Sequence, residues 1–207
     1  MDGDLDLSVI VPAYNEEKNV LPLYEKIAAV LETFGRSYEI VFVDDGSTDG
    51  TFEALVSITD EHVTVIRFRR NFGQTAALDA GFKAACGRIL IPMDADLQND
   101  PADIPRLVAK LEEGYDVVSG WRRERRDPWC KRVVSRGANL LRKLLIHEHI
   151  HDSGCTLKAY RRDCLQRIDL FGEMHRFIPA ILQARGFRIT EIPVAHHARR
   201  HGRSKYT

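Results

Sequence analysis

The sequence predicts an α/β fold with a mainly parallel central sheet and helices on both of its faces. Two observations lead to this prediction. Over the first 120 residues, short apolar runs alternate with segments whose apolar residues recur at helical spacing. Apolar strands that alternate with helices in this way imply a parallel sheet covered on both sides. With 207 residues, the chain is long enough for one large domain with a substantial core.

The predicted elements follow one another in a regular order. Five strands are expected, over residues 7–14, 38–45, 63–68, 88–94 and 116–120. The helices expected between them cover residues 19–34, 51–59, 75–86 and 103–114. The first helix shows the spacing most clearly, with Val20, Leu23 and Ile27 on one face. Gly87 and Gly114 mark the ends of the last two helices, because glycine readily adopts the conformation that stops a helix.

Polar motifs follow the first four predicted strands at the point where each strand ends. In chain order they are PAYNEE, DDGSTDG, RRNFGQ and DADLQND. The carboxyl ends of parallel strands meet at one edge of a sheet, and ligands of open α/β sheets bind beyond that edge. We therefore expect the four loops to line one site.

Asp94, Asp96 and Gln98 follow the fourth strand at alternating positions. In an extended segment, these three side chains would share a face, and the two residues between them would point away. Two carboxylates and an amide oxygen suit Mg²⁺ or Mn²⁺, and Mg²⁺ is typically held by one or two carboxylates together with substrate phosphates. The alternative is an acidic turn in which Asp100 caps the next helix.

Two further loops offer groups that suit a nucleoside. Asp44 and Asp45 end the second strand, where carboxylates can accept hydrogen bonds from ribose hydroxyls or from a base N–H. Their alternative role is an Asx turn followed by a helix cap. In the first loop, Pro12 shapes the strand exit, Tyr14 offers a stacking surface and Glu16 offers an acceptor. Taken alone, this loop is equally consistent with an ordinary strand-to-helix connection.

The charged residues balance overall but are unevenly distributed. The chain has 30 basic and 30 acidic residues, so its net charge gives no indication of nucleic-acid binding. Nine Lys or Arg and only two acids lie between residues 122 and 143. A second basic cluster consists of Arg199, Arg200, Arg203 and Lys205. Such clusters suit phosphates or an anionic membrane surface, and the alternative is a solvated charged face.

One segment has the pattern of a helix at a membrane surface. Apolar residues interleaved with Lys and Arg over residues 133–145 predict a helix in a bilayer interface, with Trp129 as an anchor, or an amphipathic helix packed on the sheet. No stretch approaches the roughly 18–20 apolar residues that a membrane span needs. The four cysteines form no CxxC pair, which favours a reducing, cytosolic setting.

Four motifs, in this order, make the chain resemble the family 2 glycosyltransferases: VPAYNEE, VDDGSTDGT, RNFGQTAALDAGF and MDADLQNDP. The later segments HDSGCTLKAYRR, HRFIP and EIPVAHHARRHGRSKY resemble the polyprenyl-phosphate branch of that family. This branch includes dolichol-phosphate mannose synthases, bactoprenol glucosyltransferases and the aminoarabinose transferases of lipid A modification. The resemblance covers about residues 7–206 and implies a nucleotide-sugar-binding, GT-A-like fold. Within a single domain, 1–207, residues 1–120 would bind the nucleotide sugar, and residues 121–207 would bind the acceptor and close the site.

The resemblance also implies a role for individual residues. The nucleotide would be held by Pro12, Tyr14, Glu16, Asp44, Asp45, Asn71, Asp94 and Ala95. The metal would be held by Asp94, Asp96 and Gln98, and the catalytic set would be Asp94, Asp96 and Asp152. The donor diphosphate would be held by Arg200, Arg203 and Lys205. The acceptor phosphate would be held by Arg122, Arg126, Lys131, Arg132 and Ser135.

The implied function is transfer of a sugar from a nucleotide diphosphate sugar to undecaprenyl or dolichyl phosphate at the cytoplasmic face of the membrane. A UDP-sugar is favoured over GDP-mannose, and membrane helices are expected beyond Thr207. A phosphate monoester has its second pKa near 6, so the acceptor needs no obligatory general base, and a single displacement inverts the anomeric carbon. Asp152 is a candidate base, and its alternative role is to orient a helix or the acceptor-binding arginines. Two alternatives are a soluble family 2 transferase with a hydroxyl acceptor, which needs a base, and a non-catalytic nucleotide-sugar-binding subunit.

Overall fold

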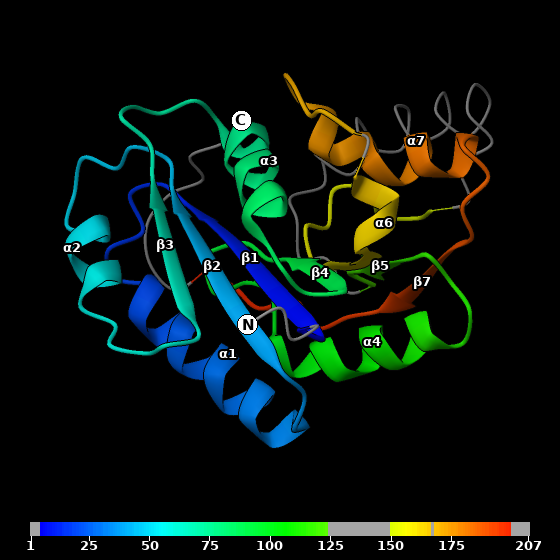
Figure 1. Ribbon diagram of the computed structural model, residues 1–207, viewed down its shortest axis with the longest axis horizontal. Coiled ribbons are helices and arrows are strands. Elements are labelled where there is room, and N and C mark those ends of the chain that lie inside the picture. Colours follow the sequence, from blue (N-terminus) through cyan, green and yellow to red (C-terminus); the bar gives the residue numbers. More distant parts are fainter. Residues whose placement is uncertain (1–4, 124–149, 167, 200–207) are drawn as a thin grey trace.

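A computed structural model describes residues 5–123, 150–166 and 168–199 of the chain. In this part, seven strands form one sheet in the order β3-β2-β1-β4-β6-β5-β7 (Figure 1). The strands are β1 (Leu7–Ala13), β2 (Tyr38–Asp44), β3 (Val63–Arg67), β4 (Ile89–Pro92), β5 (Val117–Trp121), β6 (Lys158–Arg161) and β7 (Ile189–Pro193). All five predicted strands are present, whereas β6 and β7 lie in a region for which the sequence analysis predicts no strands.

The sheet is mainly parallel, as predicted, and it contains one strand of opposite direction. Strand β1 pairs in parallel with β2 and β4, β2 with β3, and β5 with β7. Strand β6 lies between β4 and β5 and is antiparallel to both. Because β6 runs the other way, the residues that precede it lie at the same edge as the residues that follow the parallel strands.

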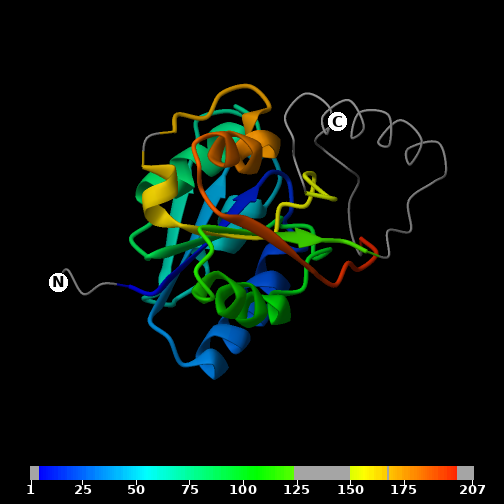
Figure 2. The same cartoon turned by 90° about the vertical axis from the view of Figure 1, so that its right-hand side faces the viewer.

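Helices cover both faces of the sheet, which confirms the predicted architecture (Figures 1 and 2). One core lies between the sheet and the helices α1 (Val20–Phe34), α2 (Thr51–Val56) and α4 (Ile104–Glu112). The other core contains residues of α3 (Gln74–Ala84), α6 (Arg162–Leu165) and α7 (Ile178–Ala184). Two short 3₁₀ turns, η1 (Pro101–Asp103) and η2 (Met174–Phe177), precede α4 and α7.

Helix α1 shows how the sequence pattern becomes packing. Its residues Val20, Leu23, Ile27 and Leu31 are all buried in the core under β1 and β2. Burying each such side chain contributes about 1.5–3 kcal/mol relative to leaving it in water. The helix ends at Gly35, whose φ of 68° is a left-handed conformation that glycine adopts without steric cost.

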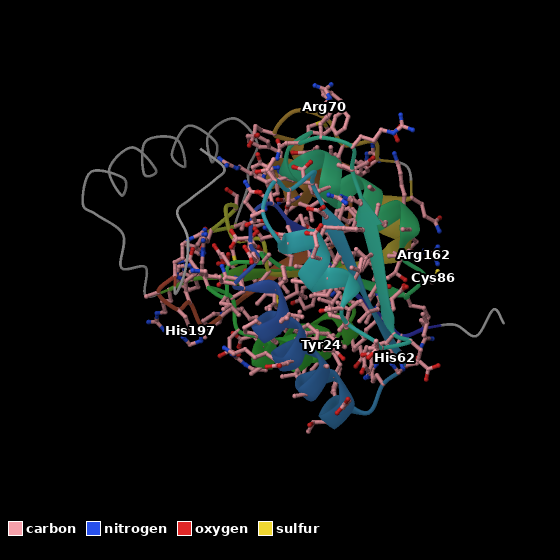
Figure 3. All side chains as sticks on the ribbon, turned by 90° about the vertical axis from the view of Figure 1, so that its left-hand side faces the viewer. Tyr24, His62, Arg70, Cys86, Arg162 and His197 are labelled. Carbon is pink, nitrogen blue, oxygen red and sulfur yellow. The ribbon has the colours of Figure 1, made fainter. Side chains whose placement is uncertain are left out.

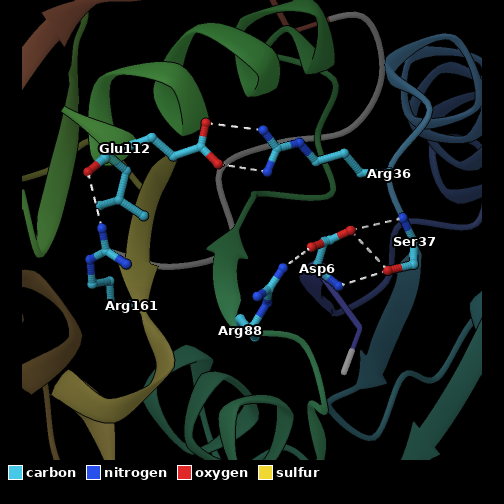
Figure 4. Close-up of polar contacts among 7 residues, drawn as sticks. Asp6, Arg36, Ser37, Arg88, Glu112 and Arg161 are labelled. Atoms are coloured by element: carbon cyan, nitrogen blue, oxygen red, sulfur yellow. Dashed lines mark hydrogen bonds and ion pairs between the residues drawn. The ribbon is translucent and has the colours of Figure 1, made fainter. Parts of the chain in front are cut away.

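Exposed polar contacts hold together the edge at which the parallel strands begin (Figure 4). The guanidinium of Arg36 contacts both carboxylate oxygens of Glu112 at 2.6 and 3.0 Å, and so connects the α1–β2 loop to α4. Asp6 accepts from Arg88 and from the Ser37 hydroxyl. Exposed ion pairs of this kind contribute about 0–1 kcal/mol each. They stabilise an edge that carries none of the predicted site residues.

Candidate active site

The four motif loops meet at the carboxyl edge of the parallel strands, as predicted. The first two loops are connected because the backbone N–H of Asn15 donates to the Ser47 hydroxyl at 2.9 Å. The third and fourth are connected because the side-chain amide of Gln74, at the start of α3, donates to Asp94 at 2.8 Å. His197, which contacts the fourth loop, lies on the opposite side of the molecule from His62, which precedes β3 (Figure 3). The contacts of Asn15 with Ser47 and of Gln74 with Asp94 thus join segments that are far apart in sequence into one site.

Asp94 and Asp96 lie on a turn after β4 and not on an extended segment. The chain turns at Ala95 and Asp96, and Leu97 has a left-handed φ of 62°. Ala95 and Leu97 point into the core, as expected, while the carboxylate of Asp96 accepts from the backbone N–H of Gln98 at 3.0 Å. The extended geometry predicted for this segment is wrong, because a local side-chain-to-backbone hydrogen bond closes the turn.

The two aspartates form a concentrated negative charge. Burial, followed by the nearby charge of Asp96, raises the pKa of Asp94 to about 6. Thr156, Arg122 and Lys158 act in the opposite direction and favour the Asp94 carboxylate. Two close carboxylates, one of them desolvated, are stabilised by a cation placed between or beside them.

A segment after β7 brings such a cation to the turn. The residues Ala195–Arg199, here called the strap, run beside the Asp96 turn. The backbone of His197 exchanges hydrogen bonds with Gln98: its N–H donates to the Gln98 carbonyl at 2.8 Å, and its carbonyl accepts from the Gln98 side chain at 3.2 Å. Arg199 then reaches the Asp96 carboxylate at 2.5 Å and the Glu16 carboxylate at 3.4 Å.

Arg199 is one of the site residues to which the sequence analysis assigns no role. The sequence shows it only as a member of the second basic cluster. The available signal is its position at the start of that cluster, within the segment EIPVAHHARRHGRSKY that carries the family resemblance. Arg200, Arg203 and Lys205, to which the diphosphate role was assigned, lie outside the described residues.

The aspartates at the end of β2 have two different environments. The carboxylate of Asp45 accepts from the backbone N–H of Phe72 at 2.7 Å, that of Gly73 at 2.9 Å and the side chain of Asn71 at 3.0 Å. Asp45 thus shapes the β3–α3 loop, and Asn71 contributes to the same arrangement. The loops approach so closely that a Cβ on Gly46 would lie 2.3 Å from the backbone of Arg70.

Asp44 is the better candidate for ligand contact. It is fully buried, and one of its oxygens accepts from the Ser47 N–H at 3.0 Å. Its other oxygen has no hydrogen-bond partner in the described structure and lies 3.4 Å from Nε of Arg67. A buried carboxylate oxygen without a hydrogen bond is costly, so this atom fits a ligand that brings an N–H or O–H donor. Of the other predicted nucleotide residues, Tyr14 is half-buried, whereas Pro12 and Ala95 are buried.

Arg122 and Asp152 form a buried ion pair at this edge. Nε and Nη2 of Arg122 donate to the two oxygens of Asp152 at 2.7 and 2.9 Å. The side chains are only 11% and 6% exposed. Asp152 immediately precedes the segment that leads into β6. Burial alone would lower the pKa of Arg122, but the hydrogen bond and the charge of Asp152 outweigh it and raise that pKa. The remaining residues assigned to the acceptor phosphate, Arg126, Lys131, Arg132 and Ser135, lie outside the described residues.

His175 lies in η2 and contacts the start of α3 next to the site. Its Nδ1 lies 2.6 Å from the hydroxyl of Thr75, one residue after the Gln74 that donates to Asp94. Burial, followed by the charges of Arg176 and Lys158, lowers the pKa of His175 to about 4. The imidazole is therefore neutral at physiological pH and serves as a hydrogen-bonding group at this position.

This low pKa predicts that the folded protein loses stability in mild acid. The unfolded histidine gains a proton near pH 6.5, whereas the folded histidine gains it only near pH 4. The contribution of His175 is thus present above about pH 6.5 and is lost as the pH falls toward 4, on the order of 1–2 kcal/mol after allowance for solvent screening. Urea unfolding at pH 7 and 4.5 should show a smaller loss for His175→Gln than for wild type. The exposed control His62→Gln should retain the wild-type loss, and an equal loss in His175→Gln would contradict the assignment.

A comparison with models of protein families shows which family the chain belongs to. A family model described as glycosyl transferase family 2 matches residues 8–169, which is well over half of the chain. The chain belongs to glycosyl transferase family 2. This confirms the resemblance noted in the four loop motifs, all of which lie within the matched region.

Two curated relatives of this family 2 chain are similar over nearly all of it. A dodecaprenyl-phosphate galacturonate synthase from Rhizobium johnstonii is 44% identical over 209 residues, covering 98% of this chain and 62% of the relative. An undecaprenyl-phosphate 4-deoxy-4-formamido-L-arabinose transferase from Salmonella paratyphi A is 41% identical over 204 residues, covering 97% of this chain and 62% of the relative. The chain therefore spans less than two thirds of the length of these relatives.

Solved structures confirm the GT-A-like fold of this family 2 chain. Glucosyl-3-phosphoglycerate synthase from Mycobacterium tuberculosis, in complex with Mn²⁺, UDP and phosphoglyceric acid, matches with a TM-score of 0.78 at 22% identity, covering 96% of this chain and 72% of that one. A mannosyltransferase from Pyrobaculum calidifontis, in complex with GDP-mannose and Mn²⁺, matches with a TM-score of 0.68 at 23% identity, covering 92% and 55%. At these identities the likeness establishes the fold alone.

Proposed function

We propose that the protein transfers a sugar from a nucleotide diphosphate sugar to a polyprenyl phosphate, with inversion at the anomeric carbon and with the help of a divalent cation. The observation that carries this proposal is the pair Asp94 and Asp96, placed where the loops of β1 to β4 meet. The two curated relatives support the acceptor class, because both names contain a polyprenyl phosphate.

Asp94 and Asp96 are the residues that would hold Mg²⁺ or Mn²⁺. Their chemistry fits a hard cation, and such a cation would favour the ionised form of Asp94, whose pKa is raised by burial and then by the charge of Asp96. Within residues 5–123, 150–166 and 168–199, no three His, Cys, Asp or Glu side chains form a metal cluster. A metal site made of only the two carboxylates Asp94 and Asp96 would leave coordination positions for diphosphate oxygens, as is typical of Mg²⁺. Gln98 is a candidate through its oxygen, since its nitrogen donates to His197.

The bound cation would neutralise the charge that develops on the leaving nucleoside diphosphate. In the proposed reaction, an oxygen of the acceptor phosphate bonds to the anomeric carbon while the bond from that carbon to the diphosphate oxygen breaks. The acceptor is largely dianionic at neutral pH and needs no base. Asp152 then has a positioning role, supported by its two contacts with Arg122. With a hydroxyl acceptor, Asp152 would instead have to act as the base.

The environment of Asp44 favours uracil as the base of the donor. Uracil presents one imide N–H between two carbonyl groups, whereas guanine presents two adjacent donors. Only one oxygen of Asp44 lacks a hydrogen bond, and the guanidinium of Arg67 beside it can donate to a carbonyl. Arg67 is 46% exposed, so its side chain can shift enough to admit the base while staying beside it. A single acceptor next to a donor matches uracil better than guanine.

We place the reaction at the cytoplasmic face of the membrane, because the proposed acceptor is a membrane lipid. Among the helices that the structure describes, none combines the length and the apolar character needed to cross a bilayer. The amphipathic segment 133–145 lies outside the described residues and stays a prediction.

The proposal is tested by transfer from radiolabelled UDP-sugars in the presence of Mn²⁺. We expect label in the lipid extract with undecaprenyl or dolichyl phosphate, and none with an alkyl glycoside that offers only hydroxyl groups. Transfer to the hydroxyl acceptor alone would favour the soluble transferase, and donor binding without any transfer would favour a non-catalytic subunit.

Nucleotide selectivity can be tested at Asp44 separately. Wild type should bind UDP more tightly than GDP in Mn²⁺, and Asp44→Asn should weaken UDP binding roughly tenfold, because a hydrogen bond to a charged acceptor is weakened. Isothermal titration calorimetry measures both affinities, with Asp60→Asn, on the opposite edge of the sheet, as the matched control. Equal affinity of Asp44→Asn and wild type for UDP would contradict the assignment.

A further inference from the structure

Arg199 occupies the position at which a cation is needed. Its side chain is 23% exposed and contacts Asp96 and Glu16, which are 11% and 9% exposed. Its two terminal nitrogens go to different carboxylates, at 2.5 Å for Asp96 and 3.4 Å for Glu16. The positive charge of the guanidinium offsets part of the negative charge of the turn.

The contact with Asp96 conflicts with the role proposed for that residue. A carboxylate oxygen that receives a close guanidinium hydrogen bond cannot offer the same lone pairs to a metal ion. Two cations on one carboxylate also repel each other. Arg199 and the metal therefore compete for Asp96.

We propose that Arg199 is the resting counter-cation of Asp96 and that the divalent metal displaces it. This inference rests on the proposed function, because it takes Asp96 as a metal ligand. Entry of the metal and departure of the Arg199 side chain are then one exchange, in which Asp96 is never left without a positive partner. The released guanidinium remains at the site, where it can bind an anionic group of the donor.

The strap allows this exchange without unfolding. It is held independently of Arg199, through the bridge between Asn99 and His196 and through the hydrogen bond of His197 to Asp100 at 2.9 Å. A groove of about 490 Å³ borders the strap and is lined by Lys26, Leu97, Asp100, His197, Ala198 and Arg199. The long Arg199 side chain can move into this space while the backbone of the strap stays in place.

The test is a titration of the full chain with Mn²⁺ in the absence of nucleotide, with unbound Mn²⁺ measured by electron paramagnetic resonance. We expect Arg199→Met to bind Mn²⁺ roughly tenfold more tightly than wild type, because its competitor is gone. Arg199→Lys keeps the charge and should stay close to wild type. Arg36→Met, which removes an arginine from the ion pair with Glu112 at the opposite edge, is the matched control and should not change the affinity.

A purely structural role for Arg199 would weaken metal binding or leave it unchanged, and either result overturns the proposal. So does the absence of measurable Mn²⁺ binding in both wild type and Arg199→Met. Circular dichroism at each titration temperature verifies that the variants are folded. Because the readout involves no sugar transfer, a failure of the proposed function with tighter Mn²⁺ binding in Arg199→Met would leave this inference standing.

Discussion

Replacing Asp96 with asparagine should lower kcat/KM for sugar transfer by about 10²–10³-fold, the range seen when one group that stabilises developing transition-state charge is removed. The carboxylate contacts Arg199 at 2.5 Å and is, in our proposal, a ligand of the cation that neutralises the leaving diphosphate. Asparagine keeps the size of the side chain and can still accept from Gln98, so the turn should persist. The measurement is initial-rate transfer of radiolabelled sugar to undecaprenyl phosphate in Mn²⁺.

The matched control for this prediction is Asp60→Asn. Asp60 accepts hydrogen bonds from Tyr24 and His62, at the edge where the parallel strands begin, and its removal should not affect kcat/KM. A chelator should bring wild type down toward the rate of Asp96→Asn. Full activity of Asp96→Asn in the presence of the chelator would remove the basis for a metal-dependent mechanism.

Asp152→Asn should lower the free energy of unfolding by about 3–5 kcal/mol, which is the cost of leaving one partner of a buried ion pair without the other. The guanidinium of Arg122 would stay in an environment where its side chain is only 11% exposed. Urea unfolding at pH 7 measures the change. If the variant folds, sugar transfer should fall but not vanish, because the phosphate acceptor requires no base.

Two further variants separate this prediction from a general sensitivity to mutation. Glu112→Gln disrupts the exposed pair with Arg36 and should cost about 0–1 kcal/mol. The double variant Arg122→Met with Asp152→Leu replaces both charges by apolar groups and should recover much of the lost stability. A loss below about 1 kcal/mol in Asp152→Asn would show that solvent screens the Arg122 pair.

The first 120 residues could be predicted well because local patterns determine their elements. Helix α1 has four core residues at helical spacing and ends at a glycine in the left-handed conformation. Strands β1 and β2 are apolar over most of their length. Strand β6 carries no such pattern, since it has only four residues, two of them Lys158 and Arg161. Its insertion between β4 and β5 depends on contacts between distant segments, which a local pattern does not encode.

The same distinction holds for the site. The loops that follow strands were predictable, because the carboxyl edge of a parallel sheet is a general binding location. The different roles of Asp44 and Asp45 were not predictable from the sequence. They depend on the backbone N–H groups of the β3–α3 loop, which donate hydrogen bonds to Asp45. The partners of Asp96 and Asp152 lie 103 and 30 residues away in sequence. Pairings of this range become visible only in the folded chain.

The position of β6 has a consequence for synthesis of the protein on the ribosome. Strands β1 to β4 are complete once Pro92 has been made, but the strand that covers the outer side of β4 begins only at Lys158. Until then, β4 presents an open hydrogen-bonding edge, which is a template for pairing with another nascent chain. Chaperone protection of this chain would therefore matter most between those two points of translation.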